Sequence, residues 1–338
     1  DINNEIKKGS PFTVRLKTPQ DGKTSFEDLI YGNISVKNNE IDDFIIARSD
    51  GSPVYNLTNV VDDSLMEITH VIRGEDHVSN TPKQILIYNA LGFKVPTFAH
   101  LPMILGEDKK RLSKRHGATG VNEYESMGYQ PDALLNYLVL LGWNPGTDEE
   151  IFDLDSLVKN FDIKKVQKKS AIYDQKKFNW ISSQHLMKED SEKVLNRLAS
   201  IDPKWGEYKS QDYLVKVIDL IKPRSNSLSD LVDKSQYLFS SPKEFDSTQL
   251  QKIWKQDTTE TLIELKSILG AMNSWVASGL ESNFKSFAIH RGLGFGKVMK
   301  PMRFLICGSL QGPSLFDLME LIGKEESLKR INYAINKF

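Results

Sequence analysis

The spacing of hydrophobic residues changes along the chain and predicts two kinds of structure. In residues 12–17, apolar and polar side chains alternate, which is the period of a half-buried strand. Residues 34–36 and 44–47 have the composition of further strands. We therefore expect the chain to open with antiparallel strands.

Residues 54–105 alternate between helical and strand spacing. A helical pattern over 54–66 is followed by a short apolar strand at 69–72, a second helix over 85–91 and another strand over 98–105. This order is half of a doubly wound nucleotide-binding sheet, in which ligands bind at the carboxyl ends of the strands. The sequence thus predicts a Rossmann-like half-sheet.

Nearly all of the chain after Asp153 has helical spacing. Before it, Pro131 and Gly142 bracket an amphipathic helix with a typical start and end. Further helices are predicted at 213–221, 258–276 and 314–322. The expected fold class is an α/β front half followed by an all-α back half.

Composition narrows the class of protein. The 338 residues are 39% hydrophobic and 26% charged, as in an ordinary globular protein. No apolar run approaches the roughly 20 residues of a membrane helix, so we expect a cytoplasmic protein without a membrane partner. The single cysteine, Cys307, excludes an internal disulfide within these residues, and its apolar neighbours predict a buried side chain.

The basic residues are unevenly distributed. The net charge of −1 does not by itself favour a nucleic-acid partner. Attraction to phosphate is local, however, because salt screens it within about 8 to 10 Å. Seven lysines fall within residues 159–177: Lys159, Lys164, Lys165, Lys168, Lys169, Lys176 and Lys177.

The densest group of cations lies in residues 109–117, between a strand-like run and a helical pattern. Six of these nine residues are Lys, Arg or His, and Ser113 adds a hydroxyl. A loop of this kind can hold a triphosphate, because cations and hydroxyls bind phosphate oxygens. The alternative is a solvated basic surface, which composition alone favours. In the order Arg111-Leu112-Ser113-Lys114-Arg115, an apolar residue interrupts the charges and favours a fixed loop.

A second candidate site combines a helix face with a strand end. Tyr55 and Asn59 are four residues apart and share a helix face, and Arg73 follows the strand predicted at 69–72. Arginine pairs with a carboxylate through two hydrogen bonds, so the three side chains are suited to a small dicarboxylate. An ordinary helix face with a structural arginine is the alternative that the residues leave open.

Three other patterns are weak. His70 and His77 are seven residues apart without flanking cysteines, so we expect no metal site there. Ser113 has cations beside it rather than a base and an acid, which argues against a catalytic triad. The stretch Gly292–Lys297 fails both the Walker and the dinucleotide spacing, and we interpret it as a connection between helices.

Several stretches resemble the class I aminoacyl-tRNA synthetases. Residues 111–115, followed by His116-Gly117, are similar to the second signature (Lys-Met-Ser-Lys-Ser type) as it occurs in bacterial glutamyl-tRNA synthetases. The resemblance continues over residues 49–51, 55–63, 69–77 and 136–143 and extends from about Phe12 to the end of the chain. The first signature of the family, the His-Ile-Gly-His type, does not occur in these residues.

The resemblance implies an activity and its residues. It implies ligation of L-glutamate to tRNA(Glu) with ATP and Mg²⁺, by a protein that we expect to be a monomer. The glutamate-binding residues fall on Tyr55, Asn59 and Arg73, the adenosine-side residues on Asp76, His77 and Ile104, and an anticodon-reading arginine on Arg224. In the signature loop, Lys114 is the expected catalytic and ATP-binding cation, supported by Arg111, Ser113 and Arg115. Arg111 departs from the lysine that is common in the family, and Trp205, Trp254 and Trp275 are expected in the core.

The resemblance also implies a domain organisation. Residues 1–52 would end an acceptor-arm-binding insertion that is rich in strands, 53–108 form the second half of the Rossmann-like catalytic domain, and 109–170 form the signature loop and stem-contact region. Two helical anticodon-binding domains follow at 171–240 and 241–338. Because the first signature is absent, this chain alone is expected to be inactive. The alternatives are a non-catalytic tRNA-binding fragment and a glutaminyl-type relative.

Overall fold

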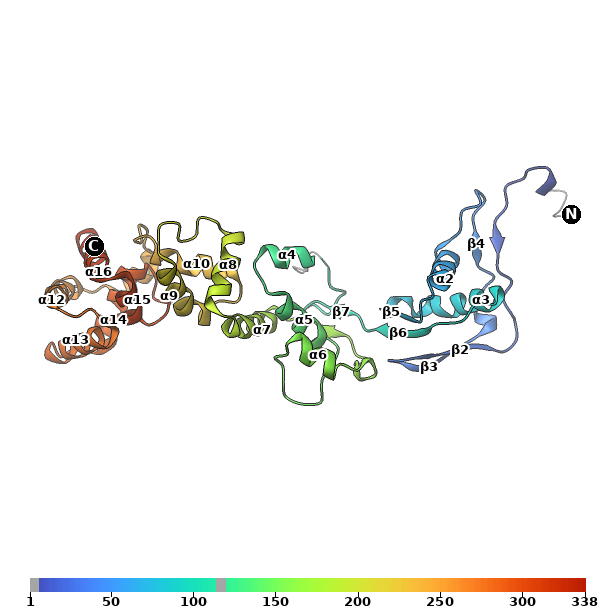
Figure 1. Cartoon of the computed structure of the whole chain (residues 1–338), viewed down its shortest axis with the longest axis horizontal. Helices are drawn as coiled ribbons and strands as arrows, with labels where there is room; N and C mark the ends of the chain where they lie inside the picture. The colour runs from blue at the N-terminus through green and yellow to red at the C-terminus, as the bar shows by residue number, and fades with distance from the viewer. Residues whose placement is uncertain (1–5, 114–119) are drawn as a thin grey trace. The chain divides into compact units, whose positions relative to one another are not determined.

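The computed structural model describes residues 6–113 and 120–338, which divide into two compact units. The front unit comprises residues up to 118 together with 135–174, and the helical unit comprises 119–134 together with 175–338. Figure 1 labels their helices and strands. The front unit contains mixed sheets with helices, and the helical unit contains helices in all of its regular elements that the structure describes, as the sequence predicts.

A four-stranded sheet forms the centre of the front unit. Its strands lie in the order β3 (Gly32–Lys37), β2 (Lys23–Asp28), β6 (Thr97–Leu101) and β5 (His70–Gly74). The hairpin β2–β3 is antiparallel, whereas β2, β6 and β5 run parallel to one another. Parallel strands end at the same edge of a sheet, so side chains at the ends of β2, β5 and β6 are brought together.

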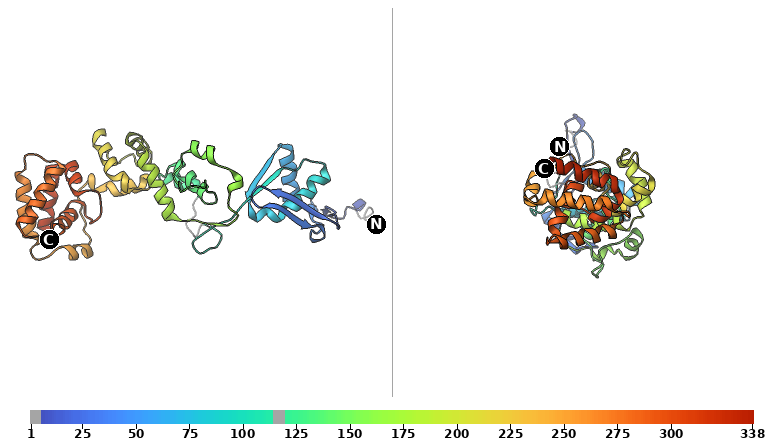
Figure 2. Two further views of the ribbon diagram at one scale, coloured as in Figure 1. Left: turned by 90° about the horizontal axis from the view of Figure 1, so that it is seen from below. Right: turned by 90° about the vertical axis from the view of Figure 1, so that its left-hand side faces the viewer.

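Helices α2 (Tyr55–Leu65) and α3 (Thr81–Leu91) pack against this sheet, as Figure 2 shows from below. The shared core includes Phe26 of β2, Val60 of α2, Tyr88 of α3 and Phe98 of β6. Gly92 ends α3 with φ of 68°, a left-handed conformation that glycine adopts without strain. The predicted helices over 54–66 and 85–91 are thus confirmed.

A two-stranded sheet precedes these elements. Strands β1 (Val14–Arg15) and β4 (Ile45–Ala47) pair antiparallel, in the region where the alternating pattern predicts strands. Between them, Asn38–Glu40 form the short 3₁₀ helix η1. A further 3₁₀ helix, η2 (Glu75–Asn80), leads directly from the end of β5 into α3.

The prediction of one continuous strand over 98–105 is wrong. The structure has two strands there, β6 ending at Leu101 and β7 (Ile104–Leu105), and β7 pairs in parallel with β8 (Ala171–Ile172) instead of joining the main sheet. Pro102 lies between them and lacks the N–H that a continuous ladder needs. β8 is a two-residue exception to the helical structure that follows Asp153, as predicted.

The rest of the front unit is a small layer of helix and loop. It includes part of α5 (Pro131–Leu140), α6 (Leu154–Asn160) and the 3₁₀ helix η4 (Ile163–Lys165). Trp143, Phe152, Leu157 and Val166 form its core with Ile30, which follows β2. Helix α5 begins at Pro131 as its pattern predicts.

The helices of the helical unit pack around one large apolar core. Phe284, Leu198 and Ile218 are fully buried in it. Its first part holds α4 (Val121–Ser126), α7 (Gln175–Lys188), α8 (Ser191–Ile201), α9 (Gln211–Ile221), η5 (Lys222–Arg224), α10 (Leu228–Ser235) and η6 (Gln236–Leu238). Its second part holds α11 (Ser247–Ile253), α12 (Thr258–Ala271), α13 (Ala277–His290), α14 (Phe295–Cys307), α15 (Leu315–Ile322) and α16 (Lys324–Lys337), the orange and red helices of Figure 2.

The helix predicted over 258–276 is shorter than expected. It ends at Ala271, and Met272 adopts extended backbone. Asn273 and Ser274 follow, and short polar side chains of this kind compete with helical hydrogen bonding. Trp275 fixes the connection before α13, because its Nε1 donates to the carbonyl oxygen of Met319 at 2.7 Å.

Among the described helices, none combines the length and the apolar character that crossing a bilayer requires.

Candidate active site

Each parallel strand of the front unit brings one polar side chain, buried or partly buried, to the same edge of the sheet. Asp28 is the last residue of β2, Arg73 lies one residue before the end of β5, and His100 lies one residue before the end of β6. Arg73 and His100 are register partners, and Asp28 is the partner of Phe98 two residues before His100. Because side chains two residues apart share a face, the three meet on the side covered by α2 and α3.

The guanidinium of Arg73 is held by partners on two of its three nitrogens. Its Nε donates to His100 Nε2 at 3.1 Å, and its Nη2 donates to Thr81 Oγ1 and Gln84 Oε1, each at 2.8 Å. Its Nη1 is buried and has no hydrogen-bond partner among the described residues. Leaving a buried charged donor unpaired is costly, which makes this nitrogen a candidate for contact with a ligand.

Two side chains extend the cluster toward α2 and η2. Tyr55, the first residue of α2, is about half exposed, and its hydroxyl lies 3.4 Å from His77 Nδ1. Burial lowers the pKa of Arg73, while Tyr55, whose hydroxyl is near enough to hydrogen-bond the guanidinium, and the carboxylate of Asp63 act in the opposite direction. Asn59 lies one turn after Tyr55 on α2. Among the described contacts that join the cluster, none involves the Asn59 side chain.

The adenosine-side candidates adjoin the start of the signature loop. Arg111 Nη2 lies 3.4 Å from Asp76 Oδ2, and the Leu112 amide donates to the carbonyl oxygen of Ile104 at 3.0 Å. The chain reverses through Lys109, which has a positive φ of 59°. The structure thus brings Asp76, Ile104 and Arg111 together, although their sequence spacing does not reveal it.

Four residues of the signature loop were predicted to act on ATP. Arg111 and Ser113 lie within the described residues, and Arg111 is exposed apart from its ion pair with Asp76. Lys114 and Arg115 lie outside the described residues.

Glu75 fixes the backbone beside this loop. One carboxylate oxygen accepts from the amide of Met103 at 2.9 Å, and the other accepts from the Tyr31 hydroxyl at 2.5 Å. Burial, together with Glu75, raises the pKa of Tyr31 to about 12, so the phenol stays protonated and continues to donate. The connection between β6 and β7 is therefore anchored to the residue that follows β5.

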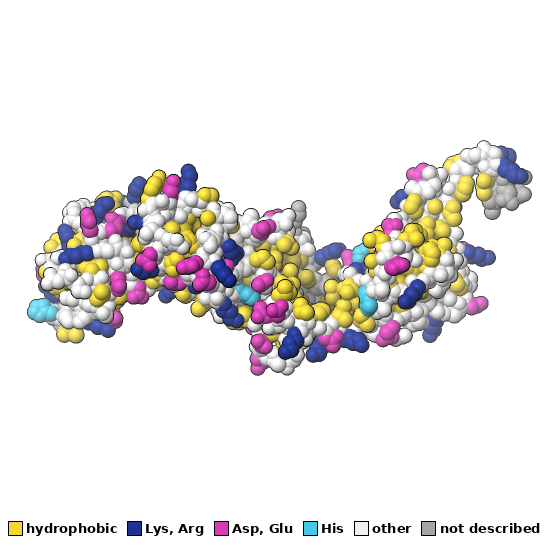
Figure 3. Space-filling view, in the orientation of Figure 1, with side chains coloured by type: hydrophobic (Ala, Val, Ile, Leu, Met, Phe, Trp, Pro, Cys, Tyr) yellow, Lys and Arg dark blue, Asp and Glu magenta, His cyan; other side chains and the backbone are white. Residues whose placement is uncertain are grey.

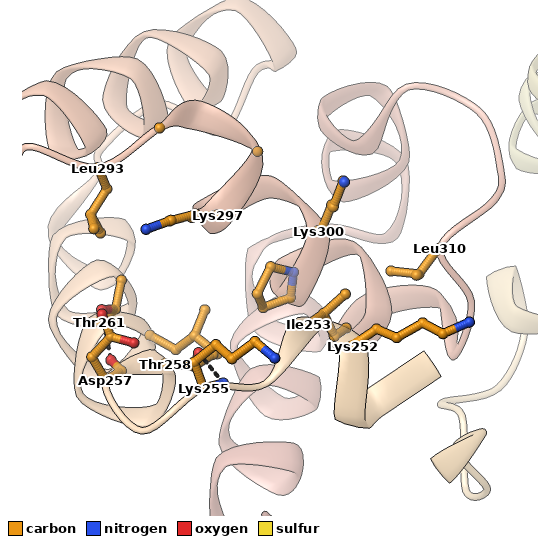
Figure 4. A pocket seen from close by; sticks show the side chains of 14 residues that line it. Lys252, Ile253, Lys255, Asp257, Thr258, Thr261, Leu293, Lys297, Lys300 and Leu310 are labelled. Carbon is orange, nitrogen blue, oxygen red and sulfur yellow. Dashed lines mark hydrogen bonds between the residues drawn. The ribbon is translucent and has the colours of Figure 1, made fainter. Parts of the chain in front are cut away.

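The helical unit contains a cavity of about 680 Å³ with lysines around it. Lys252, Lys255, Lys297 and Lys300 line it from α11, the connection to α12, and α14 (Figure 4). Asp257 is the acidic member of the lining. On the face of this unit drawn in Figure 3, Lys and Arg side chains are interspersed with Asp and Glu. The cavity lining, with four lysines and one aspartate, is more positively charged than that surface.

The glycine-rich stretch Gly292–Lys297 includes the predicted connection between two helices, and its last three residues form the start of α14. Helix α13 ends at His290, and α14 begins at Phe295 after Gly294. Its basic residue Lys297 contributes to the cavity wall.

The remaining predictions in the helical unit concern single residues. Arg224 lies exposed in η5 and its backbone carbonyl accepts from Lys234 Nζ at 2.5 Å. Cys307 is buried, as predicted, and burial raises the pKa of its thiol to about 12. Trp205, Trp254 and Trp275 pack against the core, which confirms the expectation for all three.

Sequence reasoning missed four residues that hold Arg73. They are Asp28, His100, Thr81 and Gln84, and all four side chains are buried. A histidine inside an otherwise apolar strand, as in Phe98-Ala99-His100-Leu101, is the one local signal that would have indicated them. Asp28 is 72 residues from His100, and no pattern in the sequence connects them.

Comparison with known proteins gives consistent results. Residues 1–180 match the family model of the tRNA synthetases class I (E and Q), catalytic domain, and residues 191–335 match an anticodon binding domain. A glutamate–tRNA ligase of Geobacter sulfurreducens is 41% identical over 331 residues, covering 96% of this chain and 70% of that protein. Glutamate–tRNA ligase 1 of Caldanaerobacter subterraneus subsp. tengcongensis is 39% identical over 338 residues, covering 99% and 70%.

A solved structure supports the same relationship. The crystal structure of a glutamate tRNA ligase from Elizabethkingia meningosepticum in complex with its amino acid has a TM-score of 0.86 and 34% sequence identity. The match covers 99% of this chain and 70% of the other.

Proposed function

The chain belongs to the class I tRNA synthetases for glutamate and glutamine, and we propose that it acts as a glutamate–tRNA ligase that activates L-glutamate with ATP and transfers it to tRNA(Glu). The observation that carries the choice of amino acid is the buried, unpaired Nη1 of Arg73. A side-chain carboxylate would satisfy this donor, whereas a neutral amide would present a mixed donor and acceptor group.

The proposed amino-acid site comprises Tyr55, Asn59 and Arg73. Arg73 would bind the side-chain carboxylate of glutamate, and the half-exposed Tyr55 and its helix neighbour Asn59 would orient the rest of the molecule. The support is the convergence of Arg73 with Tyr55 and His77 at the end of the parallel strands, where ligands of such sheets bind.

The reaction requires no nucleophile from the protein. The α-carboxylate of glutamate attacks the α-phosphorus of ATP and pyrophosphate leaves, which gives glutamyl adenylate. A terminal ribose hydroxyl of the tRNA then takes the acyl group, and AMP leaves. The protein contributes position and positive charge where negative charge develops.

The proposed nucleotide site comprises Asp76, His77 and Ile104 on the adenosine side and the signature loop on the triphosphate side. Arg111 faces Asp76 at 3.4 Å, which supports a role in holding the loop. We assign neutralisation of the triphosphate to Lys114, with Ser113 and Arg115 fixing the loop. Mg²⁺ accompanies ATP through the phosphates and retained water, as is usual for this ion.

We propose that the helical unit binds the tRNA. Arg224 is exposed and would read an anticodon base, and the lysine-lined cavity of the same unit would hold backbone phosphates. We keep the division into residues 1–52, 53–108, 109–170, 171–240 and 241–338 as a proposal, together with a cytoplasmic, monomeric protein.

The test is glutamate-dependent ATP–pyrophosphate exchange by the purified protein, with and without tRNA(Glu), alongside its intact mass. Exchange that requires L-glutamate supports the proposal. No exchange at the mass of 338 residues, with salt-sensitive tRNA binding retained, would contradict it and favour a fragment that binds tRNA without activating glutamate.

A further inference from the structure

We propose that Asp28 and His100 are positioning residues for amino-acid recognition, which orient the Arg73 guanidinium so that its Nη1 is left for the glutamate carboxylate. The inference rests on the proposed function, in which Arg73 binds that carboxylate. It assigns a role to two buried polar residues that neither touch the ligand nor belong to the apolar core.

The carboxylate of Asp28 is fixed by the backbone. Its side chain is fully buried, and Oδ1 accepts from the amides of Ile30 and Tyr31, each at 2.9 Å. Its Oδ2 accepts from the His100 amide at 3.1 Å and lies 2.6 Å from His100 Nδ1. These contacts occupy both oxygens and leave Oδ2 facing the imidazole in one orientation.

The neighbours of His100 favour one protonation pattern of its imidazole, whose Nε2 lies 3.1 Å from both Arg73 Nε and the Thr81 hydroxyl oxygen. Arginine Nε is a donor only, so His100 Nε2 must accept from Arg73 at 3.1 Å. The proton therefore sits on Nδ1 and is donated to Asp28 Oδ2. Burial lowers the pKa of His100, and the adjacent Arg73 acts in the same direction, which keeps the imidazole neutral despite Asp28. A carboxylate that fixes the tautomer of a histidine is a recurrent device in functional sites.

The result is a guanidinium with one nitrogen that makes no hydrogen bond to the described residues. His100 takes the Nε edge and α3 takes Nη2 through Thr81 and Gln84, while Nη1 stays buried without a partner among the described residues. If the only role of position 73 were to pack against the strands, an apolar side chain would fill the space without placing a charge there. A guanidinium held at two edges loses little freedom on binding a ligand, and its placement matters because a shift of about 1 Å can cost about 100-fold in rate.

The test uses Asp28→Asn in the purified protein. The asparagine has nearly the same size as the aspartate and can still accept from the Ile30 and Tyr31 amides. Its amide nitrogen would face His100 Nδ1 and favour the tautomer protonated at Nε2. Two donors, His100 Nε2–H and Arg73 Nε–H, would then face each other. We expect kcat/KM for glutamate in ATP–pyrophosphate exchange to fall about 10- to 100-fold, with the KM for ATP unchanged. His100→Gln should cause a similar loss, and the double variant should lose no more than the worse single one, because the residues act in one chain.

The matched control is His70→Gln. His70 lies in the same strand as Arg73, at its opposite end, and its exposed imidazole bonds to Thr69. This variant should keep the wild-type kcat/KM for glutamate.

Two outcomes separate the inference from the proposed function. If the wild-type protein shows no glutamate-dependent exchange, the proposed function fails and the inference fails with it. If the wild type is active and folded Asp28→Asn keeps its kcat/KM for glutamate, the inference alone is overturned.

If a variant does not fold, a measurement on the wild-type protein that requires no turnover still tests the inference. Nitrogen NMR of the wild-type histidines should show His100 protonated at Nδ1, assigned by the signal that disappears in His100→Gln. Protonation at Nε2 in the wild type would overturn the inference, because Nε2 then donates toward Arg73 instead of accepting from it.

Discussion

Two arginines with buried guanidinium nitrogens, one in each unit, have different surroundings. Arg330 in α16 is 2% exposed, and its guanidinium donates to the carbonyl oxygens of Tyr237 and Ile306, each at 2.7 Å, and to Glu326 at 2.8 Å. Within the described residues, none of its buried nitrogens lacks a partner, whereas Nη1 of Arg73 does. The partners of Arg330 join three segments, which is a structural role. The unpaired nitrogen of Arg73 supports its proposed role in binding a ligand.

The largest effect is expected from Arg330→Ala. Removing this cation leaves the carbonyl oxygens of Tyr237 and Ile306 without their donor, and each buried acceptor left unpaired costs about 1–3 kcal/mol. Chemical denaturation monitored by circular dichroism measures the free energy of unfolding of the helical unit. The exposed neighbour Lys329, changed to Ala, is the control and should alter it by less than about 0.5 kcal/mol. Equal losses in the two variants would contradict a structural role for Arg330.

Arg73→Lys tests the other side of the comparison. An ammonium cannot bond to His100 and also present a second nitrogen sideways to a carboxylate, so kcat/KM for glutamate should fall about 100-fold or more while the folded state persists. Exchange kinetics measure the loss, and Arg48→Lys, an exposed arginine of the same unit that bonds to Ser52, should show none. Wild-type kinetics in Arg73→Lys would remove Arg73 from the amino-acid site.

Lys114→Ala should affect the chemical step instead of amino-acid binding. In its proposed role Lys114 neutralises the triphosphate, so its loss should lower the adenylation rate at least about 10-fold, with tRNA affinity nearly unchanged. Single-turnover formation of glutamyl adenylate measures the rate directly. An unchanged rate in the intact enzyme would take this role away from Lys114.

The lysine-lined cavity predicts a smaller, salt-dependent effect. Replacing Lys297 and Lys300 together with Ala should weaken tRNA binding several-fold and reduce the salt slope by about 0.7 to 0.9 for each phosphate that is no longer neutralised. The glutamate KM should not change. Lys193→Ala with Lys285→Ala removes two exposed lysines of the same unit that lie outside the cavity. If both pairs weaken binding equally, the cavity is no more than part of a diffuse positive surface.

The smallest effect concerns an exposed helix cap. Asp246 accepts from the amides of Gln249 and Thr248 at the start of α11, and these bonds hold its pKa below the ordinary value. A lowered pKa in the folded state means that the stabilisation is fully present above the ordinary value and is lost as pH falls through the folded value. Unfolding measured between about pH 7 and 3 should show this acid loss, reduced in Asp246→Asn, which keeps a cap without titrating. An identical pH dependence in the variant would contradict the assignment.

The sequence predicted elements whose signals are local. Gly92 ends α3, Pro131 begins α5 and Gly294 precedes α14, because glycine and proline act through their own backbone. The strand over 98–105 was predicted as one, since hydrophobicity continues across Pro102 and only the missing N–H divides it.

The site was predictable only in part, for a related reason. Arg73 and Tyr55 lie in stretches similar to a known family, so they were identified. Asp28 and His100 were not, because their contact depends on which strands of a sheet become neighbours, and pairing of distant strands leaves no periodic trace in the sequence. Likewise, the lysines of the cavity come from separate helices, and each alone has the character of a solvated surface residue.

The most direct test of the central claim is the preference of the wild-type protein for L-glutamate over L-glutamine in ATP–pyrophosphate exchange, measured as a ratio of kcat/KM with tRNA(Glu) present. If the unpaired Nη1 of Arg73 recognises a carboxylate, glutamate should be preferred by at least about 100-fold, because an amide offers only one acceptor oxygen and no negative charge to the guanidinium. A ratio near one, or a preference for glutamine, would contradict the account.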